Sequence, residues 1–318
     1  MLIPIILIII GLTILIIGGE LVVRGSASIA KKLGVKPIVI GLTVVAFGTS
    51  APELVVNIFS ALRGTPDIAI GNVVGSNIAN ILLILGICAL IRPLKVSIGT
   101  VWKEVPLALL AVILILFLGN DAFTDGMNFN LLSRTDGFAL IAFFIIFLYY
   151  TFGISKVENK GSEEIAKYSW TISILLTLLG FAGLVLGGKL LIDNAIILAT
   201  IAGMSEALIG LTIVAIGTSL PELVTSLIAV RHGHDDIAIG NIVGSNIFNI
   251  FWILGLTATL LPLPFNPAVN LDIAINIFAT LLLFIFMFIH SRHKLNRWQG
   301  GLMLLSYIAY IIYLIYRG

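Results

Sequence analysis

Long apolar runs separated by short polar segments dominate the sequence. Reading each run between its flanking charges and turn residues predicts ten membrane-spanning helices, near residues 2–23, 38–62, 69–91, 104–120, 136–154, 170–192, 206–230, 238–261, 270–290 and 298–316. A helix crosses a bilayer with about 17 to 25 apolar residues, so each run is long enough. The connections are short, and they leave no room for a sizeable soluble domain. The predicted fold class is therefore an all-α polytopic membrane protein.

Composition agrees with this pattern. Of the 318 residues, 59% are hydrophobic and 11% are charged, whereas soluble proteins average about 25% charged residues. The net charge of +2, without a run rich in Lys and Arg, argues against nucleic-acid binding. No protein partner is evident. The expected environment is the lipid bilayer of a cell membrane, the plasma or inner membrane of a prokaryote, with a multi-pass chain.

The basic residues predict the orientation of the chain. If the first helix starts outside, fourteen of the 18 basic residues fall in cytoplasmic segments, and the other four, Arg63, Arg134, Lys189 and Arg317, lie outside. Cytoplasmic loops of membrane proteins carry an excess of Lys and Arg, so this bias predicts an N-out, C-out protein. The most polar stretch, 153–169, is expected to be a short cytoplasmic linker.

An internal repeat divides the chain into residues 1–152 and 170–318. At an offset of 169 positions, segment 41–86 matches segment 210–255 without a gap, with 29 identities in 46 positions. Each half is expected to hold five spans, so the second half must enter the membrane from the opposite side. Such inverted-topology repeats are typical of secondary transporters, whose sites lie near the bilayer midplane. Packing alone would preserve size and apolarity, whereas Glu, Asn, Ser and Thr are preserved here as well.

Each repeat places a glutamate beside a proline at membrane depth. Pro52 and Pro221 lack an N–H and are expected to break their helices, which exposes backbone carbonyls. Glu53 and Glu222 follow directly. A charge at the bilayer centre costs about 2.5–3.5 kcal/mol, and no Lys or Arg falls within the core of a predicted span to neutralise either residue. Their partner must be a bound cation or a proton.

Hydroxyl and amide groups surround these carboxylates in the helical pattern. Thr49 and Ser50 precede Glu53 by four and three positions, and the following helix carries Asn72, Ser76 and Asn80 at spacings of four; the second half repeats both patterns. Carboxylate, hydroxyl, amide and carbonyl oxygens suit hard cations such as Ca²⁺ or Na⁺ and argue against zinc or copper. No cofactor is expected. The spans hold no nucleophile and base pair, so the protein is not expected to be an enzyme.

Other polar residues of the spans are interpreted as structural. Asn77 and Asn246 lie off the polar stripe and are expected to hydrogen-bond between helices. Two pairs spaced by four residues near span ends are expected to be interfacial ion pairs: Glu20 with Arg24, and Lys189 with Asp193.

The paired motifs GTSAPE, from Gly48, and GTSLPE, from Gly217, are each followed by GNxVGSNIxN. In this order they resemble the alpha repeats of the cation/calcium exchanger superfamily, specifically its prokaryotic sodium/calcium exchanger branch. The resemblance covers essentially the whole chain. It implies electrogenic exchange of several Na⁺ for one Ca²⁺ by alternating access.

The same resemblance implies a set of site residues. Ca²⁺ would be held by Glu53 and Glu222 with the carbonyls of Thr49 and Thr218. Asn80 and Asn249 would lie centrally. The first and sixth spans would slide, with glycine-rich faces. The Na⁺ ligands implied by the resemblance are Ala46, Ser50, Glu53, Ser76, Ala215, Ser219, Glu222 and Ser245.

One departure from relatives bears on the coupling ion. Potassium-dependent exchangers and some prokaryotic relatives carry Asp where this chain has Asn249, which argues against K⁺ co-transport. Proton/calcium exchangers carry an acid within the second motif, whereas both copies here carry Asn, which favours Na⁺ over H⁺. An H⁺/Ca²⁺ antiporter remains an alternative, because a desolvated glutamate pair could take up protons. A cation channel built from the same oxygens is the alternative from another class.

Overall fold

A computed structural model of the chain describes residues 2–153, 168–201, 215–289 and 293–317. Within these ranges, eight helices are long and apolar enough to cross a membrane, and a ninth crossing results if the bent pair Pro37–Thr49 and Ala51–Leu62 is counted as one. The protein is thus an all-α polytopic membrane protein. The seventh predicted span, 206–230, begins outside the described residues. Most of the predicted linker, 153–169, also lies outside them.

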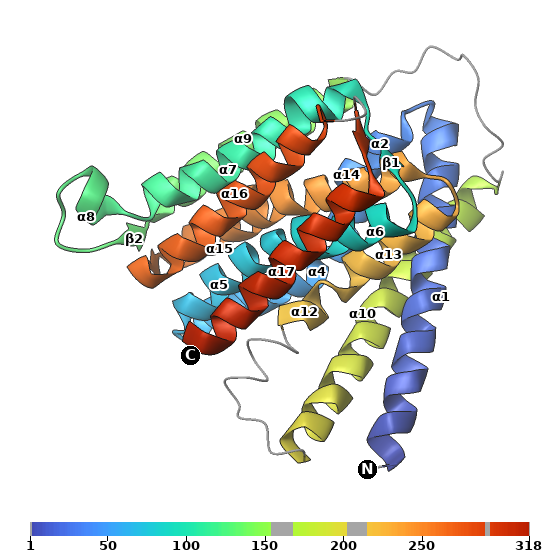
Figure 1. Ribbon diagram of the computed structural model, residues 1–318, viewed down its shortest axis with the longest axis horizontal. Helices are drawn as coiled ribbons and strands as arrows, with labels where there is room; N and C mark the ends of the chain where they lie inside the picture. The colour runs from blue at the N-terminus through green and yellow to red at the C-terminus, as the bar shows by residue number, and fades with distance from the viewer. Residues whose placement is uncertain (1, 154–167, 202–214, 290–292, 318) are drawn as a thin grey trace.

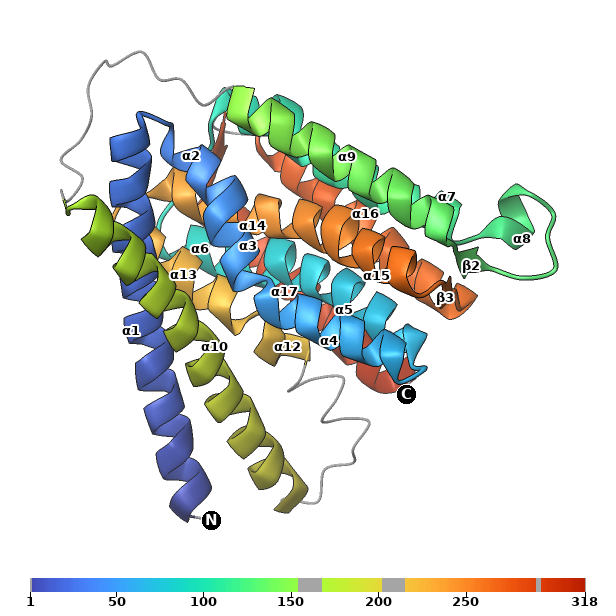
Figure 2. The same ribbon diagram turned by 180° about the vertical axis from the view of Figure 1, so that it is seen from behind.

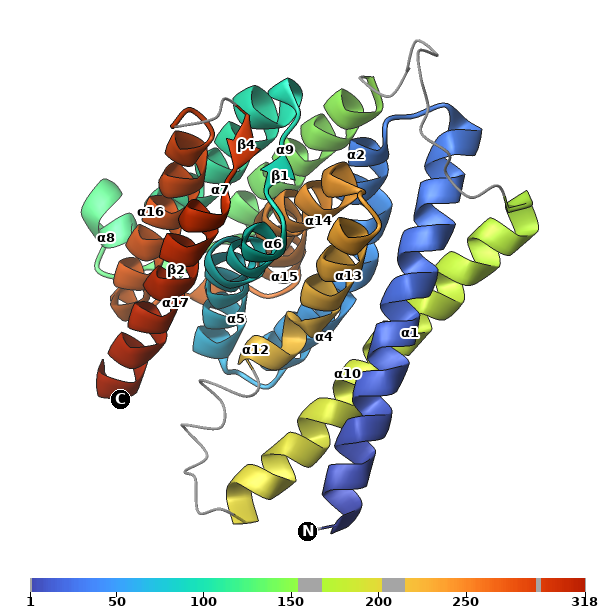
Figure 3. The ribbon, with the colours of Figure 1, turned by 45° about the vertical axis from the view of Figure 1, so that its right-hand side comes forward.

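Two long helices form a pair beside the remaining bundle. These are α1 (Leu2–Leu33) and α10 (Trp170–Ile201), which cross each other next to the other helices in Figure 3. Their backbones touch: a Cβ on Gly18 would lie 2.7 Å from the Leu184 nitrogen, and one on Gly180 would lie 2.7 Å from the Val22 nitrogen. Both helices continue beyond the predicted spans, which end near residues 23 and 192, because the polar and charged residues that follow do not break a helix.

The first half then continues as a series of short, consecutive helices. The chain turns from α1 into a π-helical stretch, η1, flanked by two single-turn helices, and bends before α4. The elements are α2 (Pro37–Ile40), η1 (Gly41–Val45), α3 (Ala46–Thr49), α4 (Ala51–Leu62), α5 (Pro66–Ile78), η2 (Ala79–Leu85), α6 (Gly86–Ile91) and β1 (Leu94–Lys95).

The second half repeats this series. The helix break at Ser50 and the π-helical stretch η2 recur 169 positions later, at Ser219 and in η5, as the sequence repeat predicts. The described elements are α12 (Ala215–Thr218), α13 (Leu220–Arg231), α14 (Asp235–Ile247), η5 (Phe248–Leu254), α15 (Gly255–Leu260) and β3 (Leu263–Pro264).

Four further crossings flank the two repeats of short helices. Most of their surface faces outward with apolar side chains, which suits lipid. The elements are η3 (Thr100–Glu104) with α7 (Val105–Leu118), α8 (Asp121–Thr124), β2 (Leu131–Leu132), α9 (Arg134–Gly153), η6 (Pro267–Val269) with α16 (Asn270–Phe286), β4 (Lys294–Leu295) and α17 (Arg297–Arg317).

The most deeply buried helix of the described bundle is α14, which continues through η5 into α15. In the 18-residue window of this span, 94% of residues are buried, compared with 22% in α1. Seen from behind in Figure 2, α2 and α3 lie along α14. Glycines allow this approach, since a Cβ on Gly240 would lie 2.9 Å from the Ile38 carbonyl oxygen. The polar motif residues on α14 are thereby placed against the broken helix of the other half.

Two short strand pairs join the halves at opposite ends of the bundle (Figure 1). At one end β1 pairs antiparallel with β4, with Leu94 opposite Leu295. At the other end β2 pairs with β3, with Leu132 opposite Leu263. Each strand of the first half therefore pairs with a strand of the second half.

Candidate functional site

The two broken helices supply the centre of the candidate site. Helix α3 ends at Thr49 and α4 begins at Ala51, and the two are bent by 46° at Ser50. The break in the second half has the same backbone geometry: φ and ψ are −83° and 9° at Ser50 and −86° and 4° at Ser219. In both halves a proline sits in the first turn of the second helix, where its missing N–H costs no hydrogen bond. The predicted breaks are confirmed.

Glu53 and Glu222 lie in the first turns of α4 and α13. Each side chain is 1% exposed, and among the described residues neither forms an ion pair. A hydrogen bond from Ser50, three residues before Glu53, to the Glu222 carboxylate brings the two helix starts together. Both glutamates also lie at a helix N-terminus, where backbone N–H groups favour negative charge. The fold thus holds two anionic groups together inside the membrane without a basic side chain.

The two carboxylates differ in their hydrogen bonds. One oxygen of Glu222 accepts from the Ser50 hydroxyl at 2.9 Å and from the Ser245 hydroxyl at 3.3 Å. In the described part of the chain neither oxygen of Glu53 accepts a hydrogen bond. Ser50 belongs to the first half and Glu222 to the second, so the site is built across the interface of the halves.

The predicted threonines also reach across this interface. The Thr49 hydroxyl donates to the Asn241 amide oxygen at 3.0 Å, and the Thr218 hydroxyl donates to the Asn72 amide oxygen at 3.4 Å. Each threonine thus anchors the break of its own half to the following long helix of the other half. These bonds hold the two breaks against each other.

Four asparagines form a symmetric network at the crossing of the π-helical ends of α5 and α14. Asn77 and Asn246 each donate to the other's backbone carbonyl, at 3.1 and 3.2 Å. The amide nitrogen of Asn80 donates to Asn246 at 2.9 Å, and that of Asn249 donates to Asn77 at 3.0 Å. The predicted structural role of Asn77 and Asn246 is confirmed.

This network orients Asn80 and Asn249. Their amide nitrogens donate to asparagines of the opposite half, so only their amide oxygens remain available as ligands. Both oxygens are buried without a partner among the described residues. An unpaired buried oxygen costs about 1–3 kcal/mol. A cation is a natural partner for such an oxygen.

Three other predicted ligands, Ala46, Ser76 and Ser219, are also buried. The hydroxyls of Ser76 and Ser219 have no partner in the described part of the chain. Ala46 is fully buried. Ala215 starts α12, and its side chain lies outside the described residues. All the predicted site residues whose side chains are described are 5% exposed or less: Ala46, Thr49, Ser50, Glu53, Ser76, Asn80, Thr218, Ser219, Glu222, Ser245 and Asn249.

Helix α10 covers both breaks. The Phe181 ring packs where Gly48 has no side chain, with ring carbons 2.1 Å from an ideal Cβ, and Ile192 packs on Gly217 in the same way at 2.5 Å. A larger residue at either glycine would collide with these side chains, which would have to shift. Side chains of α10 thus pack directly on both GTS motifs.

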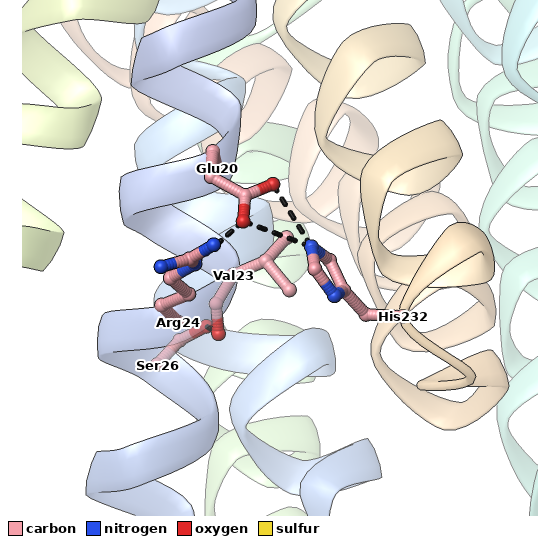
Figure 4. A network of polar contacts seen from close by, with 5 residues as sticks. All are labelled: Glu20, Val23, Arg24, Ser26 and His232. Atoms are coloured by element: carbon pink, nitrogen blue, oxygen red, sulfur yellow. Dashed lines mark hydrogen bonds and ion pairs between the residues drawn. The ribbon is translucent and has the colours of Figure 1, made fainter. Parts of the chain in front are cut away.

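The sequence did not reveal one contact between α1 and α13. The His232 Nε2 lies 2.9 Å from both carboxylate oxygens of Glu20, which also binds Arg24 (Figure 4). The predicted pairs Glu20–Arg24 and Lys189–Asp193 are both present. A separation of 212 positions along the chain gives no sequence signal for this contact. It ties the long helix α1 to the end of α13.

The donor set determines what this site can bind. Among the described residues no group of three or more His, Cys, Asp or Glu side chains could hold a metal. The two carboxylates must therefore be completed by hydroxyl, amide and backbone oxygens, a set that suits Na⁺ and Ca²⁺. Two carboxylates balance the charge of one divalent cation.

Comparison with known proteins gives a consistent result. Residues 3–153 and 172–316 match the family described as sodium/calcium exchanger protein. The chain is 38% identical to the putative antiporter CaxA of Alkalimonas amylolytica and 34% identical to the sodium/calcium exchanger MaX1 of Methanosarcina acetivorans, with 98% of each chain covered in both cases. Its structure resembles that of the sodium-calcium exchanger NCX_Mj soaked with zero Na⁺ and Ca²⁺, with a TM-score of 0.85, 35% identity, and 98% and 99% of the two chains covered.

Proposed function

The chain belongs to the sodium/calcium exchanger family, and from this premise we propose that it exchanges Na⁺ for Ca²⁺ through the site around Glu53 and Glu222. It is a multi-pass membrane protein and a transporter, not an enzyme. The transported ions are its substrates, and it acts without a cofactor. The cell membrane is its location.

The observation that carries this proposal is the buried pair of carboxylates. Both are 1% exposed and neither has a basic partner among the described residues. Taking two uncompensated charges into a membrane costs several kcal/mol, so counter-cations must enter with them. Ca²⁺ neutralises the pair alone, whereas Na⁺ must enter as two or more ions. Because both ions need the same two carboxylates, binding of one excludes the other, and this exclusion makes the protein an exchanger.

The residue roles follow the donor types. Glu53, Glu222 and the carbonyls of Thr49 and Thr218 hold Ca²⁺. Na⁺ is held by the same glutamates together with hydroxyl oxygens. The Ser50 hydroxyl, which donates to Glu222 in this structure, supplies one of these oxygens. The Asn80 and Asn249 amide oxygens lie between the ion positions. The remaining proposed Na⁺ ligands are Ala46, Ser76, Ala215, Ser219 and Ser245.

The proposed architecture has ten spans in two inverted five-helix repeats, 1–152 and 170–318, joined by the cytoplasmic linker 153–169, with both termini outside. Two contacts support it. The paired strands β1 and β4 come from segments assigned to the cytoplasmic side, and the paired strands β2 and β3 come from segments assigned to the outside. In each pair, the contact joins segments that the charge bias assigns to the same side.

Alternating access is proposed to come from movement of α1 and α10 as one unit. The glycine contacts between these two helices favour a common movement, since the helices touch backbone to backbone. Movement along the bundle changes how α10 covers Gly48 and Gly217. It also breaks the contact between Glu20 and His232, which bridges α1 and α13.

Transport is proposed to be electrogenic and independent of K⁺. If three Na⁺ exchange for one Ca²⁺, one charge crosses per cycle, worth about 2.3 kcal/mol per 100 mV. Asn249 supplies an amide oxygen and no further carboxylate, so the site has no additional charge with which to hold K⁺.

Proteoliposomes loaded with Na⁺ and diluted into Na⁺-free buffer with radioactive Ca²⁺, at equal pH on both sides, test the proposal. We expect Ca²⁺ uptake that needs the Na⁺ gradient and continues without K⁺. If three Na⁺ leave for each Ca²⁺ that enters, net positive charge leaves the vesicle, so an inside-positive potential should increase uptake and an inside-negative potential should decrease it. Uptake that ignores Na⁺ and follows a pH gradient would establish an H⁺/Ca²⁺ antiporter instead. Single-channel currents would establish a channel.

A further inference from the structure

The buried residues of α4 are all polar. They are Glu53, Asn57 and Ser60, at spacings of four and three that place them on one side of the helix. Val55 and Phe59 point away and are 53% and 55% exposed. A polar stripe therefore runs from the glutamate to the end of the helix, and its position inside the protein is not explained by contact with water or lipid headgroups.

Asn57 lies in this stripe one turn beyond Glu53. Its side chain is 0% exposed, and in the described part of the chain neither its amide oxygen nor its amide nitrogen has a hydrogen-bond partner. Leaving such groups unpaired in a protein interior costs about 1–3 kcal/mol for each. A residue that served packing alone would be apolar here.

The corresponding positions of the second half differ. Ser226 matches Asn57 and Ala229 matches Ser60 at the repeat offset. The Ser226 hydroxyl accepts a hydrogen bond from the Asn241 amide nitrogen at 3.0 Å, and buried Ile228, Ala229 and Val230 follow it in α13. Along α13 the Ser226 hydroxyl is thus held by a hydrogen bond and apolar side chains follow toward the helix end, while the neighbouring Thr225 hydroxyl is buried without a partner among the described residues.

The corresponding hydrogen bond is not formed along α4. Asn72 matches Asn241 at the repeat offset, but its amide nitrogen has no partner among the described residues. Asn57, which matches Ser226, does not accept a hydrogen bond from it. On the side of the site toward which α4 runs, the outer side in the proposed orientation, an unpartnered amide therefore stands where the second half has a hydrogen-bonded hydroxyl.

We propose that the Asn57 amide oxygen is a transfer ligand for the transported cation between Glu53 and the outer end of α4. One helical turn separates it from Glu53, about 6 Å along the axis, and Ser60 follows about 4.5 Å further. An amide oxygen is a suitable ligand for Na⁺ and Ca²⁺. It replaces part of the hydration shell that the ion loses before it reaches the carboxylate. This inference rests on the proposed function of the Glu53 site.

The test uses the full-length protein in proteoliposomes and measures the KM for Ca²⁺ on each membrane face separately. The faces are identified by an impermeant thiol label on Arg63→Cys, at the end of α4. We expect Asn57→Ala to raise the Ca²⁺ KM about tenfold on the face where α4 ends, consistent with a lost ion contact of about 1.4 kcal/mol, with little change in KM on the other face. Asn57→Asp should lower the KM on the first face, because a carboxylate oxygen replaces the amide oxygen.

Two further variants keep the test decisive. Asn57→Ser introduces the residue that the second half carries, so it should fold and give an intermediate KM on the same face. Val55→Ala, on the lipid side of the same turn, should leave both KM values unchanged. Equal KM changes on both faces, or no change with either Asn57→Ala or Asn57→Asp, would overturn the proposal. If wild-type Ca²⁺ flux ignores Na⁺, the proposed exchange fails, but the one-sided KM shift is still measurable.

Discussion

Glu53→Gln separates ion binding from folding. The substitution keeps the shape of the side chain and removes one of the two charges that balance Ca²⁺. With Glu222 alone, bound Ca²⁺ leaves one unit of positive charge uncompensated at membrane depth, which costs about 2.5–3.5 kcal/mol. At 1.4 kcal/mol per factor of ten, Ca²⁺ binding should weaken by about 60- to 300-fold.

The same variant should not destabilise the ion-free protein. Neither oxygen of Glu53 accepts a hydrogen bond among the described residues, so the amide loses no existing contact, and a buried charge is removed. We expect the Tm in ion-free detergent to stay equal to that of the wild type or to rise. In the wild type, Ca²⁺ should raise the Tm, because a ligand that binds only the folded state stabilises it; in Glu53→Gln it should not.

The assay combines a Ca²⁺ titration of the Tm with radioactive Ca²⁺ flux. Glu104→Gln is the matched control, because Glu104 is also buried, at 4% exposure, but is bonded to Tyr150 away from the site. The control should bind Ca²⁺ like the wild type. Wild-type Ca²⁺ affinity in Glu53→Gln, or equal loss in Glu104→Gln, would refute the assignment of Glu53 as a Ca²⁺ ligand.

Three further predictions concern neighbouring parts of the site. Ser50→Ala removes a Na⁺ ligand and a 2.9 Å hydrogen bond to Glu222, worth about 1.5–3 kcal/mol. In ion titrations of flux, it should weaken Na⁺ activation at least tenfold and Ca²⁺ binding less. Equal losses for the two ions would contradict the separate roles. Asn246→Ala removes two side-chain hydrogen bonds between the halves and should destabilise the fold by about 1–2 kcal/mol in detergent melts, whereas an unchanged Tm would argue against its structural role. Gly18→Ala should lower the transport rate, because its Cβ would lie 2.7 Å from the α10 backbone. The control Gly188→Ala should transport normally, because its Cβ would lie 3.6 Å from a side-chain carbon. Similar rates in both variants would exclude the glycine contact as a requirement for transport.

The sequence predicts the broken helices well because their cause is local. A proline fixes φ and removes an N–H wherever it stands, so Pro52 and Pro221 indicated the breaks at Ser50 and Ser219 without knowledge of the fold. The depth of Glu53 and Glu222 also followed, since both lie within apolar runs. The predicted ligands then came together in the structure because the inverted halves place matching motifs against each other.

Contacts between distant segments could not be predicted in the same way. Whether His232 reaches Glu20 depends on how α13 packs on α1, and no periodicity along either helix contains this information. The full lengths of α1 and α10 could not be predicted for a related reason: charged residues end an apolar run but do not end a helix. Asn57 did leave a signal, since it departs from Ser226 in the repeat, but its meaning required the burial and unpaired groups that the structure shows.

The central claim is that Na⁺ and Ca²⁺ occupy one shared site built on Glu53 and Glu222. Equilibrium binding of radioactive Ca²⁺ to the purified protein, measured over a series of Na⁺ concentrations, tests it most directly. The account predicts one Ca²⁺ per chain, complete displacement by Na⁺ with a dependence steeper than first order, and loss of Ca²⁺ binding in Glu222→Gln. Ca²⁺ that stays bound at saturating Na⁺, or that binds equally to Glu222→Gln, would contradict it.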